Sequence, residues 1–367
     1  MIVIISNRNL NGKLDAKAKP FSFLGKDLGD HGNVYGKLIN NNTRLSLYSE
    51  SDKAKLFDPV VKKIKAGDAR LSRPWVLFLH GNNQTTAKNI AKAVDIEKQH
   101  DVNVIAFSWP SQPYTGKQDP VLNAIKKEAV KHMIKALGGT NIVNMVLSKA
   151  AGKAEEFLRN YLQARMNAEK SPPDFSHALK VISDLLLKQT GKKVKLSFMC
   201  HSLGNYLLQN TVQNGMPVPI RFKNIMLHQA DVDALSHAKW VKKLYPKKDR
   251  LYITANQYDY ILMASNFVNR KERLGQTKHH YGVNNCTYID LSDAAYTSAE
   301  NEHEFFRLSD RAKGFSYTND EIHALMGKVC RSERPAFSRT AGFTKKEDNC
   351  YHLVEYIDPI DDEIRHR

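Results

Sequence analysis

The sequence predicts an α/β fold in which a mostly parallel sheet is covered by helices on both faces. Two observations carry this prediction: short apolar runs rich in β-branched residues recur along the chain, and segments with helical periodicity separate several of them. Runs that are apolar at consecutive positions are typical of strands buried on both faces, as in parallel sheets. Strands that alternate with helices are joined by right-handed crossovers in one sheet.

The N-terminal residues predict short strands ahead of the main sheet. Residues 1–5 are apolar, but they are too few and lack the basic lead of a signal peptide, so we expect a strand. The alternating residues 44–48 predict a further strand or hairpin. We expect residues 1–70 to form a β-containing extension packed on the core.

The core is expected over residues 71–310, which hold six further strand-like runs. Segments with helical character follow the first and the third of these runs, at residues 85–99 and 205–212. The predicted core strands are residues 75–79, 102–107, 194–199, 224–228, 251–254 and 287–291, and we expect the last of these to be the final strand.

A helical insertion of about residues 112–190 separates the second and third core strands, and it is too long for a simple crossover. We expect an amphipathic helix at residues 121–137 and further helix at residues 157–166 and 175–188. These helices pack either as ordinary crossover helices or as a cap over a site, with lysines facing an anionic interface. Residues 311–367 are expected to form a C-terminal extension.

Composition and charge exclude several classes of protein. The chain has 367 residues, of which 42% are hydrophobic and 25% charged; this is globular composition, which excludes long disorder or a fibrous repeat. No run approaches the roughly 20 apolar residues that a membrane-spanning helix needs. The four cysteines form no CxxC pair, which argues against a disulfide scaffold and fits synthesis in the reducing cytoplasm.

The chain is strongly basic, with 55 basic and 38 acidic residues and a net charge of +17. Such an excess favours polyanionic partners, either nucleic acid or an anionic membrane surface. Neither a zinc-finger spacing nor an RNA-binding aromatic motif is present, so we expect no nucleic-acid partner.

A nucleophilic serine is predicted at a turn between a strand and a helix. Residues 200–204 read Cys-His-Ser-Leu-Gly, a small-x-Ser-x-Gly pattern between a predicted strand and a predicted helix. Small residues two positions before and after Ser202 let the two elements approach, and the tight turn projects the hydroxyl above the sheet. A plain strand-to-helix turn is the alternative. Cys200 stands where glycine is usual, and we expect His201 to have a packing role.

An acyl-transfer site also needs two backbone N–H groups that stabilise an oxyanion. The first is expected at Leu203, directly after the serine, where the start of the helix adds a favourable dipole. The second is expected from the turn at residues 80–83, with the amide of Asn82 favoured and that of Asn83 as the alternative.

Five short segments occur in a fixed order over about residues 73–306, and together they carry a family resemblance. They are residues 78–83, 107–111, 201–205, 230–233 and 255–259. In these segments the chain resembles the α/β-hydrolase superfamily, and in particular the bacterial α/β hydrolases of domain of unknown function 900. The resemblance implies an α/β-hydrolase fold with a catalytic serine, acid and histidine in that chain order.

The order implied by the resemblance assigns the other two catalytic residues. Asp259 follows a late predicted strand and is expected to orient the histidine, with Asp231 and Asp233 as alternatives. His303 follows the last predicted core strand and is expected to be the general base. The alternatives for the base are His279, His280 and His323.

The function implied is a serine hydrolase that cleaves carboxylic esters, favouring lipid or other acyl esters as a lipase, phospholipase or esterase. Related folds include bacterial phospholipases delivered into rival cells. A further hypothesis is therefore that the protein is a delivered antibacterial effector, with a secretion adaptor or an immunity protein as its partner. The alternative is a non-catalytic binding module that keeps the turn at Ser202 as part of its scaffold. Neither an HExxH nor a P-loop motif occurs, so we expect no metal, no cofactor and no nucleotide hydrolysis.

Overall fold

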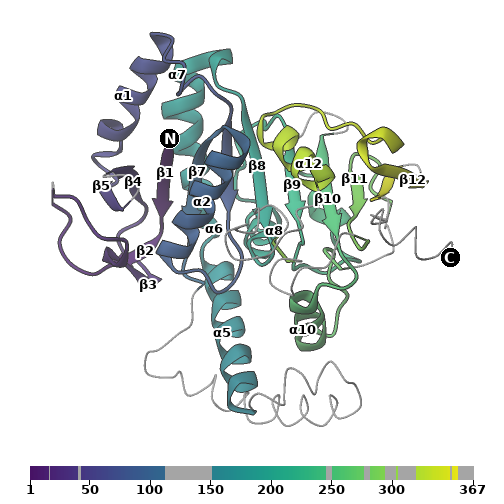
Figure 1. Cartoon of the computed structure of the whole chain (residues 1–367). Coiled ribbons are helices and arrows are strands. Elements are labelled where there is room, and N and C mark those ends of the chain that lie inside the picture. The colour runs from purple at the N-terminus through teal and green to yellow at the C-terminus, as the bar shows by residue number, and fades with distance from the viewer. Residues whose placement is uncertain are drawn as a thin grey trace, which may run out of the picture.

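A computed structural model gives the structure of the chain (Figure 1). It describes residues 1–15, 17–39, 43–111, 151–244, 250–276, 282–293, 303–304, 320–347 and 349–353. The helix expected at residues 121–137 lies outside the described residues.

One large sheet runs through the described part of the molecule, in the order β12-β13-β11-β10-β9-β8-β6-β7-β1-β4-β5. All neighbours from β13 to β1 pair in parallel, and the antiparallel pairs lie at the two ends. The predicted mostly parallel α/β sheet is therefore confirmed. The strands are β1 (Ile2–Ser6), β4 (Val34–Ile39), β5 (Arg44–Tyr48), β6 (Trp75–Leu79), β7 (Asn103–Ser108), β8 (Leu196–His201), β9 (Ile225–His228), β10 (Leu251–Ala255), β11 (Thr287–Asp290), β12 (Phe343–Glu347) and β13 (Cys350–Leu353). A separate hairpin pairs β2 (Arg8–Leu10) with β3 (Leu24–Leu28).

Helices cover both faces of this sheet (Figure 1). The α-helices are α1 (Lys53–Lys65), α2 (Thr86–His100), α5 (Ala151–Lys170), α6 (Pro172–Ile182), α7 (Lys188–Thr190), α8 (Gly204–Gln213), α9 (Ala238–Val241), α10 (Tyr260–Asn269) and α12 (Asp320–Cys330). A π-helical turn at Ser183–Leu187 joins α6 to α7, so the helix expected at residues 175–188 is present but irregular.

The core consists of two hydrophobic layers, one on each face of the sheet, and the alternating direction of side chains along each apolar strand explains them. Along β6, Leu77 and Leu79 enter the hydrophobic layer shared with α1, α6 and α8, whereas Val76 and Phe78 enter the layer shared with α2 and α12. Because successive side chains of a strand point to opposite faces, a run that is apolar at every position feeds both layers.

The sheet extends beyond the predicted core at both ends. β1 lies beside β7 and parallel to it, with Ile4 opposite Ala106, so the N-terminal residues supply a strand to the central sheet. At the other edge β13 pairs in parallel with β11, and β12 follows as the outermost strand. The expectation that residues 287–291 form the final strand is therefore wrong. β12 carries the charged, exposed residues that suit a sheet edge, and β13 has the polar, half-buried Tyr351 and His352 at its centre, so neither strand shows a buried-strand pattern.

In the described part of the insertion, α6 packs on one face of the sheet, and α5 projects from the end at which the parallel strands finish (Figure 1). The guanidinium of Arg165 lies 4.2 Å from the ring centre of Tyr206, which attaches α5 to α8. The hydroxyl of Tyr161 donates a hydrogen bond of 2.9 Å to Asp231, in the loop after β9. Within the described residues, no helix is both long enough and apolar enough to cross a membrane.

Candidate active site

Ser202 occupies a strained turn between β8 and α8. Its backbone has a φ of 51°, in the left-handed region that costs a residue with a side chain roughly 1–2 kcal/mol. Hydrogen bonds hold the turn in place: the Ser202 amide donates to the carbonyl of His228 at 3.0 Å, and the side chain of Asn205 donates to the Ser202 carbonyl at 3.0 Å. Strain fixed by surrounding hydrogen bonds is typical of functional positions.

Two glycines allow the elements around Ser202 to approach closely. A Cβ atom on Gly204 would lie 2.6 Å from the carbonyl oxygen of His80, and one on Gly81 would lie 2.7 Å from the Ser202 Cβ. Both distances are too short for non-bonded atoms, so glycine is required where α8 meets the end of β6. Gly204 of the small-x-Ser-x-Gly pattern therefore has the steric reason that the sequence predicts.

Asp259 and His303 are joined by a hydrogen bond. The Nδ1 atom of His303 lies 2.6 Å from Oδ2 of Asp259, and both side chains are buried. A carboxylate can only accept here, so Nδ1 carries the hydrogen and Nε2 is the nitrogen left to act as a base. The second oxygen of Asp259 accepts from the amide of Leu262, which caps α10 and fixes the carboxylate.

The surroundings of His303 set its basicity. Burial by itself lowers the pKa of His303, but the adjacent Asp259 carboxylate outweighs burial and holds that pKa above its ordinary value. Glu304 also raises the pKa, and Lys92 opposes it. An imidazole paired with a buried carboxylate is suited to accept a proton during a reaction and to remain charged until it returns that proton.

His201 connects the serine turn to the histidine loop. Its Nε2 atom donates a hydrogen bond of 2.8 Å to the backbone carbonyl of His303, and the two rings lie 4.8 Å apart between centres. Burial lowers the pKa of His201 well below its ordinary value, so the ring is neutral at neutral pH. Since Ser202 directly follows His201, the structure places the chain segments of the predicted nucleophile and the predicted base in contact.

A second tie to the histidine loop comes from α2. The ammonium of Lys92, almost fully buried, pairs with the carboxylate of Glu304, the residue after His303. Neither residue is a candidate from the sequence alone. The only signal for this pair in the sequence is that Lys92 falls within residues 85–99, where apolar residues recur with helical periodicity.

The two predicted oxyanion donors are available. Within the described residues, the amides of Leu203 and Asn82 have no hydrogen-bond acceptor, whereas the amide of Asn83 donates to the carbonyl of Ser111 at 2.6 Å. The structure therefore favours Asn82 over Asn83 as the second donor, as the sequence does.

A buried arginine fixes the loop that carries Asn82. The guanidinium of Arg8 donates to the carbonyl of Gln84 at 2.7 Å, to the carbonyl of Trp109, and to the hydroxyl of Ser108 at 3.0 Å. These contacts tie together the loops that follow β6 and β7. Burial lowers the pKa of Arg8 to about 9, so the group remains charged near neutral pH. Arg8 is not predicted from the sequence, because it belongs to a segment outside the family resemblance.

The alternative acids have other partners. The buried carboxylate of Asp231 accepts hydrogen bonds from Tyr161 and Ser265, with Arg273 at 3.6 Å. Asp233 accepts from the amide of Leu235, and Lys271 lies 3.6 Å away. Neither of these carboxylates has a described contact with His303.

Of the alternative histidines, the one that the structure describes, His323, is not brought to the site. His323 lies in α12, where its ring packs 5.0 Å from that of His100. His279 and His280 lie outside the described residues. Among the described side chains, no group of three or more His, Cys, Asp or Glu is arranged to hold a metal ion.

Comparison with known proteins gives one match. No curated protein and no solved structure matches the chain. A family model described as an α/β hydrolase of unknown function (DUF900) matches residues 62–293, a span that contains Ser202 and Asp259 and ends ten residues before His303. The match covers more than half of the chain, and the protein therefore belongs to the α/β-hydrolase family of unknown function DUF900.

Proposed function

We propose that the protein is a serine hydrolase that cleaves carboxylic esters through an acyl-enzyme. The observation that carries the proposal is the hydrogen bond between Asp259 and His303. His201 donates to the carbonyl of His303 and directly precedes Ser202 in the strained turn. A nucleophile, a base and a group that orients the base are the parts that such catalysis needs.

The reaction uses these groups in two halves. His303 Nε2 takes the proton of Ser202 as Oγ attacks the ester carbonyl, and Asp259 stabilises the imidazolium that forms. The amides of Leu203 and Asn82 stabilise the negative charge on the carbonyl oxygen. His303 then returns the proton to the alcohol that leaves. In the second half, His303 takes a proton from a water molecule as that water attacks the acyl carbon. The bond to Ser202 Oγ then breaks, His303 returns the proton to Oγ, and the acid leaves.

The proposal extends to lipid or other acyl esters as substrates, because of what surrounds the site. Among the described residues, the large hydrophobic side chains with marked exposure are Leu235, 69% exposed, and Tyr258, 39% exposed. They lie in the loops after β9 and β10, at the same end of the sheet as Ser202. Exposed lysines at positions 239, 242 and 243 follow Leu235 along the chain. Apolar side chains beside cations suit the surface of an anionic membrane.

Labelling with a fluorophosphonate probe tests the proposed nucleophile. We expect the wild-type protein to be labelled at Ser202 and to hydrolyse p-nitrophenyl butyrate, and Ser202→Ala to do neither. The small ester is included because a covered site can exclude the larger probe. A folded wild-type protein that neither reacts with the probe nor turns over the ester would contradict the proposal and favour a non-catalytic binding module.

The lipid substrate needs its own measurement. We expect fatty acid release from phosphatidylglycerol vesicles by the wild type and none by Ser202→Ala. Periplasmic expression asks in addition whether this activity lyses bacteria, as a phospholipase delivered into rival cells would. Turnover of the soluble ester without lipid hydrolysis or lysis would leave the esterase proposal in place and overturn the lipid substrate.

A further inference from the structure

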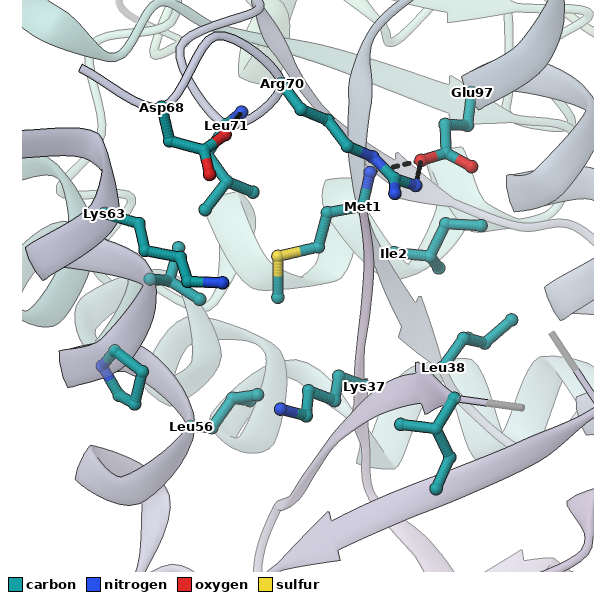
Figure 2. Close-up of a pocket in the computed structure, with 13 residues that line it drawn as sticks. Met1, Ile2, Lys37, Leu38, Leu56, Lys63, Asp68, Arg70, Leu71 and Glu97 are labelled. Atoms are coloured by element: carbon teal, nitrogen blue, oxygen red, sulfur yellow. Dashed lines mark hydrogen bonds and ion pairs between the residues drawn. The ribbon is translucent and has the colours of Figure 1, made fainter. Parts of the chain in front are cut away.

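A cavity lies far from Ser202, at the opposite end of the sheet. It has a volume of about 370 Å³ and lies between α1, β4 and the first residues of β1 (Figure 2). Ser202 follows the carboxyl end of β8, whereas this cavity is lined by Ile2 at the amino end of β1, and β1 runs in the same direction as the other core strands. The proposed hydrolytic mechanism makes no use of this cavity.

The wall of the cavity is largely aliphatic. Leu56 and Val60 come from α1, Leu38 and Ile39 come from β4, and the side chain of Met1 lies between them. None of the described residues that line it is aromatic, so none of them would stack against a nucleotide base. The volume is near the lower end of the range for small-molecule sites.

Two lysines supply charge that the described residues leave uncompensated. In Figure 2 the ammonium groups of Lys37 and Lys63 point into the cavity. Neither forms an ion pair or hydrogen bond with any described residue. Arg70 already pairs with Glu97, at 3.1 Å.

The acidic residues of the cavity are already engaged. Glu97 also binds the backbone nitrogen of Met1, and Asp68 accepts a hydrogen bond of 3.0 Å from the amide of Leu71. A divalent cation would therefore have to compete with these partners and with two lysines. The cavity suits an anion with a flexible apolar body.

We propose that the cavity between α1 and β4 binds an aliphatic monocarboxylate of the fatty-acid type. The carboxylate would lie between the ammonium groups of Lys37 and Lys63, and the chain would pack on Leu38, Leu56 and Val60. A hydrogen bond to a charged group is stronger than one between neutral groups, and burial of each methylene of the chain is also favourable. Charge and chain therefore both contribute to binding, and a ligand lacking either binds weakly.

Titration with sodium octanoate tests this site, with 1-octanol and acetate as probes that lack the charge or the chain. Selective ¹³C labelling of isoleucine methyl groups reports the position, because Ile39 lines the cavity. We expect octanoate to shift the Ile39 signal and to bind at least about tenfold more tightly than either probe. We expect the same in Ser202→Ala, because the site is independent of the proposed catalysis.

Matched variants separate the cavity from general surface charge. Lys37→Gln and Lys63→Gln should each weaken octanoate binding about tenfold, and Leu38→Trp should fill the cavity and abolish binding. Lys62→Gln, which removes an exposed neighbour outside the cavity, should bind as the wild type does. Equal affinity in Lys62→Gln and Lys63→Gln, equal affinity for octanoate and 1-octanol, or an unmoved Ile39 signal would each overturn the proposal.

Discussion

At the scale of single residues, His303 is held from three directions. Asp259 accepts from its ring, His201 donates to its carbonyl, and Lys92 pairs with the next residue, Glu304. The ring hydrogen bond fixes the tautomer, and the other two contacts fix the loop. Proton transfer depends on both, since a base must have the right nitrogen free and lie within reach of the hydroxyl.

Asp259→Asn should lower kcat for p-nitrophenyl butyrate about 10⁴-fold, because an amide does not hold the imidazole in the reactive tautomer. Asp231→Asn is the matched control: it removes a buried charge that contacts Tyr161 and Ser265, so we expect a lower melting temperature and a much smaller loss of kcat. Steady-state kinetics and thermal unfolding of both variants check this. A larger kcat loss in Asp231→Asn than in Asp259→Asn would assign the acid to Asp231.

The charges beside His303 predict opposite shifts in the pH profile. The base must be unprotonated, and Asp259 raises its pKa above the ordinary 6.5 despite burial, so the acid limb of kcat/KM should lie above pH 6.5. Glu304→Gln removes a group that raises this pKa and should move the limb to lower pH. Lys92→Met removes a group that lowers it and should move the limb to higher pH.

The control for these two variants is Lys88→Met, at an exposed position of α2, the helix that carries Lys92. It should leave the acid limb of kcat/KM in place.

The buried rings of His201 and His228 also lie near His303. Burial lowers the pKa of both, that of His228 to about 3, so neither ring titrates in this range. Shifts of the same sign in Glu304→Gln and Lys92→Met would refute the electrostatic account of the pair.

At the scale of elements, the strained turn of Ser202 depends on contact between α8 and the end of β6. Gly204→Ala should destabilise the protein by about 1–3 kcal/mol, because its Cβ would collide with the carbonyl of His80 and displace the helix. The amide of Leu203 would move with the helix, so kcat should fall as well. Chemical unfolding and ester hydrolysis measure the two effects.

Gly327→Ala in α12 provides the comparison. There the added Cβ would meet chiefly the flexible end of Arg331, and alanine is the better helix former by up to about 1 kcal/mol. We expect unchanged or slightly higher stability and unchanged kcat. A Gly204→Ala protein as stable and active as Gly327→Ala would mean that the close approach is not required.

The core elements were predictable because their pattern is local. The strands β6 to β11 and the helices α2 and α8 follow from buried runs and helical periodicity, and the Ser202 turn follows from the small residues around it. The contacts that complete the candidate site are not local. Lys92 and Glu304 are 212 positions apart, and Arg8 reaches Trp109 across 101 positions, so no sequence window contains either pair.

At the scale of the whole molecule, the sheet edges could not be predicted in the same way. β1 reads as a strand in the sequence, but its place between β7 and β4 depends on pairing across about a hundred residues. β12 is charged and exposed after its first residue, and β13 has Tyr351 and His352 at its centre, so neither has the continuous apolar pattern of a buried strand. The resemblance to the α/β hydrolases ends before these segments, and it gives no template for them.

The basic charge of the whole chain predicts binding to anionic vesicles. We expect the protein to sediment with phosphatidylglycerol vesicles but not with phosphatidylcholine vesicles, and to be released as salt is raised, because screening weakens exposed charges. The double variant Lys242→Glu and Lys243→Glu should bind less, since these exposed lysines follow the exposed Leu235 along the chain. The control, Lys62→Glu with Lys65→Glu on α1, should retain more binding. Equal loss in both pairs would indicate attraction by overall charge without an oriented surface.

The most direct test of the central claim is to trap the covalent intermediate. Acid quenching during turnover of p-nitrophenyl butyrate, followed by peptide mass spectrometry, reports which residue carries the butyryl group. The account predicts the added mass on Ser202 in the wild type, and none in Ser202→Ala or in His303→Ala quenched at the same early time. A butyryl group on another residue that turns over at the catalytic rate, or the same early labelling of Ser202 in His303→Ala, would contradict it.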